Sequence, residues 1–134
     1  IEGALGGDPR IRSAHFNLGL IAEQRDDLAL AASEYEKEIE LFPGNFEALT
    51  NLGILRMRQG RTDLGIRAFE KLVEIQPDSP AGYYLLAQAY LTAGRADGRV
   101  RDLAQRAASL DPKSPRFRAL LQEIEARGGS TRLP

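Results

Sequence analysis

Residues 46–79, FEALTNLGILRMRQGRTDLGIRAFEKLVEIQPDS, decide the fold, because the rest of the chain repeats their landmarks at a fixed spacing. Leu52-Gly53 in this stretch recurs at equal intervals, upstream as Leu18-Gly19 and downstream as Leu86-Ala87. Prolines recur at the same interval, at Pro9, Pro43 and Pro77. A fixed period of roughly 20 to 50 residues is typical of proteins that stack one supersecondary unit several times.

Each unit contains two helical patterns separated by a turn. In the segment 28–41, Leu28, Ala31, Tyr35 and Ile39 are spaced by three and four residues, as on one face of an amphipathic helix. Pro43-Gly44 ends this pattern, since proline cannot continue the helical hydrogen bonds. We predict helices at 12–25, 28–41, 46–59, about 62–75, 80–93, from about Arg99 onwards, and 115–127, with no β-strand.

The third unit departs from the period by one residue. The distance from Gly94 to Pro112 exceeds that from Gly60 to Pro77 by one position. We place the extra residue in the turn RADGR around Gly98, and therefore expect the next helix to begin late.

The period, the closing prolines and an aromatic residue in the second half of the unit, Tyr35 and Phe69, resemble the tetratricopeptide repeat family. The resemblance implies an all-α fold, a right-handed α-solenoid of antiparallel helix pairs. It predicts a repeat domain at 12–127, with repeats at about 12–45, 46–79 and 80–113 and a capping helix at 115–127. We interpret residues 1–11 as the remnant of a preceding repeat or a linker, and 128–134 as a disordered tail.

Composition excludes several kinds of chemistry. The 134 residues carry a formal charge of −1 and contain no cysteine, which rules out disulfides and cysteine-ligated zinc. His15 is the single histidine, so a metal site lacks converging ligands and a packing role is expected. No phosphate-binding glycine loop or membrane-length apolar run is present. We expect no catalytic residue, no cofactor or metal, and neither nucleic acid nor membrane as a partner.

Two charged clusters remain. Glu34, Glu36, Glu38 and Glu40 alternate, so a helix divides them into two pairs pointing in different directions; we expect a solvated outer face. Cations gather near the end of the chain, where an anionic partner is a minor hypothesis: Arg95, Arg99, Arg101, Arg106, Lys113, Arg116 and Arg118.

The resemblance also implies a binding face, because the first helix of each pair lines the concave surface in this family. Asn17 and Asn51 lie one repeat apart, and asparagines so placed hold the backbone of an extended peptide in related proteins. Asparagine is also simply common at this position. The predicted peptide-binding residues on these helices are Phe16, Asn17, Leu20, Asn51, Ile54, Met57, Arg58, Tyr84, Gln88 and Leu91.

One subgroup of the family holds the carboxylate end of chaperone tails with lysines, asparagines and an arginine. This binding mode requires five residues, and at the corresponding positions of this chain only Asn51 matches. The other four hold Phe16, Leu20, Ala81 and Leu85. We therefore do not expect this chain to capture an acidic chaperone tail.

Two hypotheses follow. The first is a non-catalytic protein-interaction module that binds a polypeptide segment in its concave groove. The alternative is a structural or oligomerisation segment of a larger enzyme or a secretion or assembly protein, with the groove filled intramolecularly. Ile11, Ala14 and Ile21 would face a preceding repeat, so self-association through this N-terminal edge is a further expectation.

Overall fold

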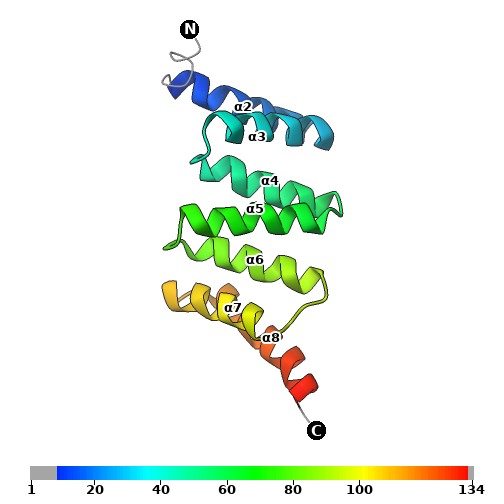
Figure 1. The fold of residues 1–134 in the computed structure, drawn as a ribbon, viewed down its shortest axis with the longest axis vertical. Helices are drawn as coiled ribbons and strands as arrows, with labels where there is room; N and C mark the ends of the chain where they lie inside the picture. Colours follow the sequence, from blue (N-terminus) through cyan, green and yellow to red (C-terminus); the bar gives the residue numbers. More distant parts are fainter. Residues whose placement is uncertain (1–8, 133–134) are drawn as a thin grey trace. The chain divides into compact units, whose positions relative to one another are not determined.

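The computed structural model describes residues 9–132, and the side chains of residues 14–127. These residues form helices and turns without a β-strand (Figure 1). The helices are α2 Pro9–Gln24, α3 Leu28–Leu41, α4 Phe46–Arg58, α5 Thr62–Ile75, α6 Pro80–Thr92, α7 Gly98–Leu110 and α8 Pro115–Arg132. The predicted all-α class is confirmed.

The two ends of the predicted domain differ from the structure. Helix α2 begins at Pro9, earlier than predicted, and proline is well tolerated in a first helical turn because its missing N–H would be unpaired there. Helix α8 continues to Arg132, through the glycines at which we expected a tail to begin. Glycine disfavours a helix by only about 1 kcal/mol, so it does not by itself end one. The expectations for residues 1–8 and 133–134 lie outside the described residues.

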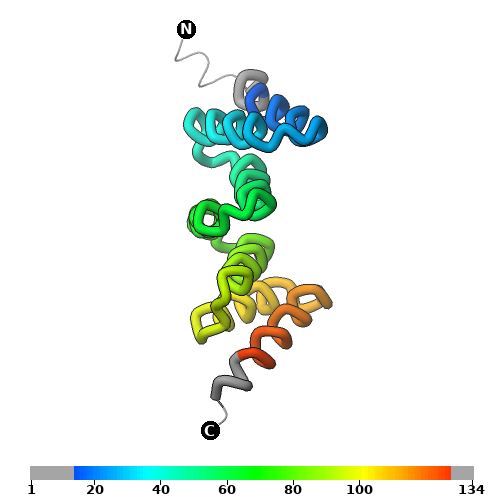
Figure 2. The backbone as a smooth tube through the Cα atoms, turned by 90° about the vertical axis from the view of Figure 1, so that its right-hand side faces the viewer, coloured from blue at the N-terminus to red at the C-terminus, as the bar shows by residue number. Residues whose placement is uncertain are grey.

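The chain divides into two compact units, Ile1–Ala68 and Phe69–Pro134, with the boundary inside α5. In the first unit α2 and α3 lie side by side in opposite directions, and α4 packs against α3 (Figure 1 and Figure 2). In the second unit α6 and α7 form an antiparallel pair, and α8 packs mainly against α7. Each unit therefore contains helix pairs of the predicted kind.

The turns inside the three helix pairs have the same backbone geometry. Asp26, Gly60 and Gly94 have positive φ angles of 59°, 76° and 85°, and they are spaced by the repeat period. After each of them an N–H donates to a carbonyl five residues earlier, at 2.9, 2.8 and 2.9 Å. This is the Schellman motif, which suits glycine and tolerates aspartate. The repeat period is thus visible in backbone conformation as well as in sequence.

The core of the first unit is built around Tyr35, whose side chain is fully buried. Its ring lies 5.9 Å from that of Phe16 and covers Gly19, where an added Cβ would overlap the ring. The Tyr35 hydroxyl donates a hydrogen bond to Glu23 at 2.5 Å. Burial and the neighbouring carboxylate raise the pKa of Tyr35, so the hydroxyl stays protonated. The buried residues packed around it are Ala22, Ala31, Ala32, Ala48 and Leu55.

Helix α7 contributes mostly small side chains to the core of the second unit. On α7, Val100, Ala104 and Ala107 are completely buried, whereas Leu103 is half-buried. On α8, Phe117, Leu120 and Ile124 are buried and Gln122 is exposed, as expected of a closing helix. Small residues on α7 bring the helices close together and bury less apolar area per residue than large ones.

The extra residue of the third unit lies in the α6–α7 turn, as predicted. Helix α7 begins at Gly98, because the Asp97 carboxylate accepts hydrogen bonds from the N–H groups of Arg99 and Val100, at 3.1 and 3.2 Å. The bond from Val100 lowers the pKa of Asp97, so this helix cap stays ionised.

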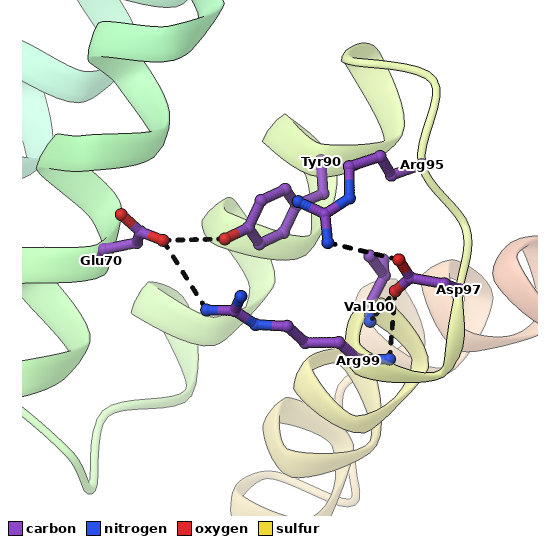
Figure 3. Close-up of polar contacts among 6 residues, drawn as sticks. All are labelled: Glu70, Tyr90, Arg95, Asp97, Arg99 and Val100. Carbon is purple, nitrogen blue, oxygen red and sulfur yellow. Dashed lines mark hydrogen bonds and ion pairs between the residues drawn. The ribbon is translucent and has the colours of Figure 1, made fainter.

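A polar network anchors this longer turn to the helices beside it (Figure 3). The Tyr90 hydroxyl donates to Glu70 at 2.8 Å, and Arg99 lies 3.7 Å from the same carboxylate. Arg95 lies over the Tyr90 ring, 4.3 Å from its centroid, and forms an ion pair with Asp97 at 3.3 Å. Burial, followed by the Glu70 carboxylate, raises the pKa of Tyr90. The inserted residue is therefore accommodated without a loose loop.

The close approach of α2 to α3 predicts the effect of a single methyl group. Gly19→Ala should lower the free energy of unfolding by about 1–3 kcal/mol, because the buried Tyr35 ring has to move away from the new Cβ. Urea denaturation midpoints measure the change. Gly44→Ala is the control: no atom lies within 4 Å of its added Cβ, so a shift within about 0.5 kcal/mol is expected. Equal losses in both variants would contradict this packing.

Candidate functional site

A pocket of about 620 Å³ opens in the first unit beside the N-terminal end of α4. Helix α2 contributes Phe16 and Asn17, the first turn of α4 contributes Phe46 and Glu47, and the connection between α3 and α4 forms the remaining wall. Asn17 is exposed, and 41% of the Phe46 surface is accessible. The pocket therefore combines an aromatic ring with an accessible amide.

The wall of this pocket is fixed by buried polar contacts. Asn45 caps α4 by accepting a hydrogen bond from the N–H of Ala48 at 3.2 Å, and its amide donates to Glu38 at 2.8 Å. Glu38 is completely buried and also accepts from the backbone N–H of Phe16, at 3.3 Å. One carboxylate on α3 thereby joins α2 to the α3–α4 connection. These hydrogen bonds fix the backbone that forms the wall of the pocket.

The acidic run on α3 corrects a prediction. It does divide into two pairs, but only Glu36 and Glu40 face solvent; Glu34 and Glu38 are buried against α2. Charge alternation alone could not reveal this, because burial of a carboxylate depends on hydrogen-bond donors that a neighbouring helix supplies.

Glu34 obtains its donors from two elements. The Nδ1 atom of His15 lies 2.8 Å from its carboxylate, and Lys37 lies 3.4 Å away on the same helix. The hydrogen bond to His15 is the main reason that the pKa of Glu34 is lowered; burial opposes it, and Lys37 adds to it. His15 therefore has a polar partner in addition to the packing role that the sequence suggested.

The predicted site residues differ widely in accessibility. Four are exposed, namely Asn17, Ile54, Arg58 and Gln88. Four are half-buried, namely Phe16, Leu20, Asn51 and Met57. Two are buried, namely Tyr84 and Leu91. The pocket brings together two members of this set, Phe16 and Asn17. The binding role of all ten residues stays a prediction.

Several members of the set already have partners in the fold. The Asn51 side chain lies near the Tyr35 hydroxyl. Arg58 lies 3.6 Å from Glu23, and Met57 packs over Gly65 at the close approach of α4 and α5. These contacts hold the helices of the first unit together, so Asn17 is the more available of the two aligned asparagines.

Tyr84 illustrates how a predicted anchor becomes part of the packing. Only 9% of its surface is exposed, because its ring lies 5.1 Å from the Phe117 ring of α8. Arg116 covers it at 4.7 Å, and Gln88 donates to its hydroxyl at 3.0 Å. The capping helix was predicted, but which aromatic ring it would cover could not be deduced from the repeat spacing.

Sequence reasoning missed the residues on either side of the α3–α4 connection. Leu41 and Phe46 line the pocket and are 49% and 41% exposed. The available signal was an apolar residue on each side of the Pro43-Gly44 turn, where a short connection normally carries polar residues.

A second pocket, of about 300 Å³, lies on the outer side of the α2–α3 pair. Leu18, Ile21 and Leu30 line it, and each is between 44% and 49% exposed. Ile21 was predicted to lie at an unpartnered N-terminal edge, and its exposure agrees with that position. The side chain of Ile11 lies outside the described ones.

Two other kinds of site are not seen in the described part of the chain. Its side chains contain no group of three or more histidines or carboxylates arranged to hold a metal ion. None of its helices has the length and apolar character needed to cross a lipid bilayer.

Comparison with known families assigns the repeat. The model of the tetratricopeptide repeat matches residues 1–46 and 50–115. The chain belongs to the tetratricopeptide repeat family.

It is 38% identical over 73 residues to cellulose synthase operon protein C of Xanthomonas axonopodis pv. citri (strain 306), covering 54% of the chain and 5% of that protein. It is 31% identical over 91 residues to stress-induced-phosphoprotein 1 of Caenorhabditis elegans, covering 68% and 28%. The chain spans less than a third of either relative.

Solved tetratricopeptide structures share the fold. A crystal structure of MamA superposes with a TM-score of 0.81 at 24% identity, covering 88% of this chain and 64% of that one. The first tetratricopeptide domain of Spaghetti, bound to the HSP90 peptide SRMEEVD, gives 0.82 at 15% identity, covering 91% and 96%. The Yersinia enterocolitica type III secretion chaperone SycD, in complex with a peptide of the translocator YopD, gives 0.80 at 16%, covering 90% and 97%. The chain thus has an all-α helical-repeat solenoid fold that protein-interaction modules use.

The pKa of Glu34 predicts how stability changes with pH. Its value in the folded state is below the ordinary 4.5, so the ionised carboxylate stabilises the fold above pH 4.5, and this contribution is lost as the pH falls through the folded value. Urea midpoints of the wild type should therefore fall more steeply below pH 4.5 than those of Glu34→Gln. Glu40→Gln removes an exposed carboxylate and should keep the wild-type slope. A Glu34→Gln slope equal to that of the wild type would refute the assignment.

Proposed function

We propose that this chain is a non-catalytic polypeptide-binding module, and that the pocket between Phe16, Asn17 and Phe46 is a primary binding site. The observation that carries the proposal is the exposure of Phe46 and Leu41 around a pocket whose wall is fixed by buried hydrogen bonds. A preformed pocket binds without the entropic cost of ordering its own side chains.

The chemistry of the pocket suits an extended peptide. Phe16, Leu41 and Phe46 offer apolar area, which favours binding by about 25 cal/mol for each Å² that a ligand buries. The Asn17 amide supplies a donor and an acceptor that a peptide backbone can use together. Apolar anchoring with a backbone-directed polar contact is one way in which grooves recognise peptides.

Relatives with the same fold support a polypeptide as the ligand. Two of the solved structures, those of Spaghetti and SycD, contain bound peptides. The positions that would grip an acidic chaperone tail hold Phe16, Leu20, Ala81 and Leu85, so we propose that this pocket selects its ligand through apolar side chains. Binding in this pocket should then depend weakly on salt.

The pocket predicts a specific loss of affinity. A peptide is first selected from a displayed library against the wild-type chain, and its Kd is measured by fluorescence anisotropy. Asn17→Ala/Phe46→Ala should raise that Kd at least about tenfold, since losing an aromatic anchor costs about 1–3 kcal/mol.

The matched control is Gln24→Ala/Ile75→Ala, which removes an exposed amide and an exposed apolar side chain outside both pockets. It should leave the Kd unchanged. Circular dichroism confirms that both variants are folded. If the two variants bind the peptide equally well, the pocket is not the binding site.

The second candidate function is a structural or oligomerising role, and the pocket lined by Leu18, Ile21 and Leu30 favours it. Leu18, Ile21 and Leu30 form an accessible apolar group on the α2–α3 pair, where another helix can pack. We propose that the isolated chain self-associates through this edge.

Self-association predicts a mass that rises with protein concentration. In light scattering, Ile21→Glu should shift the protein to the monomer because it places a charge in the apolar contact. Gln24→Glu adds the same charge to an exposed position on the same helix and serves as the control. A wild-type chain that stays monomeric at all concentrations would refute this role.

A further inference from the structure

Six of the seven cations clustered between Arg95 and Arg118, all but the half-buried Arg101, fall into two groups that the sequence does not distinguish. Arg95 and Arg99 are neutralised, by Asp97 at 3.3 Å and by Glu70 at 3.7 Å (Figure 3). A second group is exposed, and none of its members has a carboxylate within ion-pair distance among the described residues. We call this group the basic turn, and it consists of Arg106, Lys113, Arg116 and Arg118.

Two arginines of the basic turn are held in position by aromatic rings instead of by acids. The guanidinium of Arg116 lies 4.7 Å from the centroid of Tyr84, and that of Arg106 lies 5.6 Å from Tyr83. The two tyrosines are adjacent on α6, so one arginine from α7 and one from α8 each stack on a ring of that helix. Stacking restricts the arginine but leaves its N–H groups free, which prepares it to bind a carboxylate through two hydrogen bonds.

The start of α8 concentrates charge of one sign. Residues 112–122, PKSPRFRALLQ, contain three cations and no acid. The first turn of α8 carries no acidic residue, although the positive end of the helix dipole favours acids there. Of the flanking acids, Glu123 is paired with Arg127 at 2.8 Å, and Asp111 precedes the turn. Among the described residues, no ion pair therefore neutralises the cations at the start of α8.

We propose that the basic turn binds an acidic polypeptide segment, a run of Asp or Glu side chains. The inference rests on the proposed function in one respect, that the partner is a polypeptide, and it adds a second site that is selected by charge. Several unneutralised cations suit several carboxylates rather than a single chain terminus.

The charge distribution favours an acidic peptide over a nucleic acid. Duplex DNA carries one charge about every 1.7 Å along its axis, so its binders present cations along an extended surface. The cations of the basic turn lie on α7, at the α7–α8 connection and in the first turn of α8, and the chain as a whole carries a charge of −1. A short acidic segment matches this limited positive surface.

The test uses fluorescein-labelled hexaglutamate and hexaglutamine peptides, titrated with the complete chain at low and high salt. Hexaglutamate should bind and hexaglutamine should not, and the affinity should fall steeply as salt is added. The variants test the individual cations. Arg116→Gln should weaken hexaglutamate binding about fivefold. Arg116→Lys keeps the charge but loses the paired hydrogen bonds, so it should weaken hexaglutamate binding less than Arg116→Gln does. Lys113→Gln/Arg116→Gln/Arg118→Gln should abolish binding.

Arg67→Gln is the matched control, because Arg67 is exposed on α5 and its loss changes the net charge equally. It should leave the hexaglutamate affinity unchanged; an effect as large as that of Arg116→Gln would overturn the site in favour of non-specific charge. A DNA duplex that binds more tightly than hexaglutamate at the same salt would overturn the choice of a polypeptide.

The library-selected peptide separates this inference from the proposed function. Should the wild type bind that peptide but not hexaglutamate, the basic turn is not a binding site and the proposed function stands. Should the library yield no binding peptide and hexaglutamate also fail to bind, both proposals fail. Retained binding of the selected peptide by the triple variant shows that this variant is folded and that the two sites are independent.

Discussion

The contact between Gly19 and Tyr35 is the constraint on which the first unit depends. Helix α2 can approach α3 only because Gly19 has no Cβ to meet the Tyr35 ring, which is completely buried there. The same ring directs its hydroxyl to Glu23, so one side chain connects α3 to α2, and Asn51 of α4 lies near that hydroxyl. A pair of small and aromatic residues therefore fixes the spacing of helices that line the pocket between Phe16 and Phe46.

Buried carboxylates make this spacing specific. A charged group inside a protein is costly unless hydrogen-bond donors surround it, so Glu38 and Glu34 tolerate few arrangements of the helices. Glu38 accepts from the Phe16 backbone and from Asn45, and both donors also belong to the wall of the pocket. The interactions that define the fold at this point are thus the ones that shape the proposed binding site.

The charged side chains of the second unit are arranged differently. Its longer α6–α7 turn is anchored by Asp97, Glu70 and Tyr90, which neutralise or cover the nearby arginines. Beyond that network, Arg106 and Arg116 stack on tyrosines without an acidic partner among the described residues. The proposed apolar pocket therefore lies in one unit and the basic turn in the other.

The sequence alone determined the all-α class, the family, the helix order and the position of the inserted residue, because the repeat period and its turn residues act locally and recur in register. It could not determine which polar side chains would be buried, because the donors for Glu38 come from another helix and from the α3–α4 connection. Nor could it show that Tyr84 would be covered by α8, or that Phe46 would line a pocket with Phe16. Those outcomes depend on contacts between residues far apart in sequence, and only the tertiary structure brings them together.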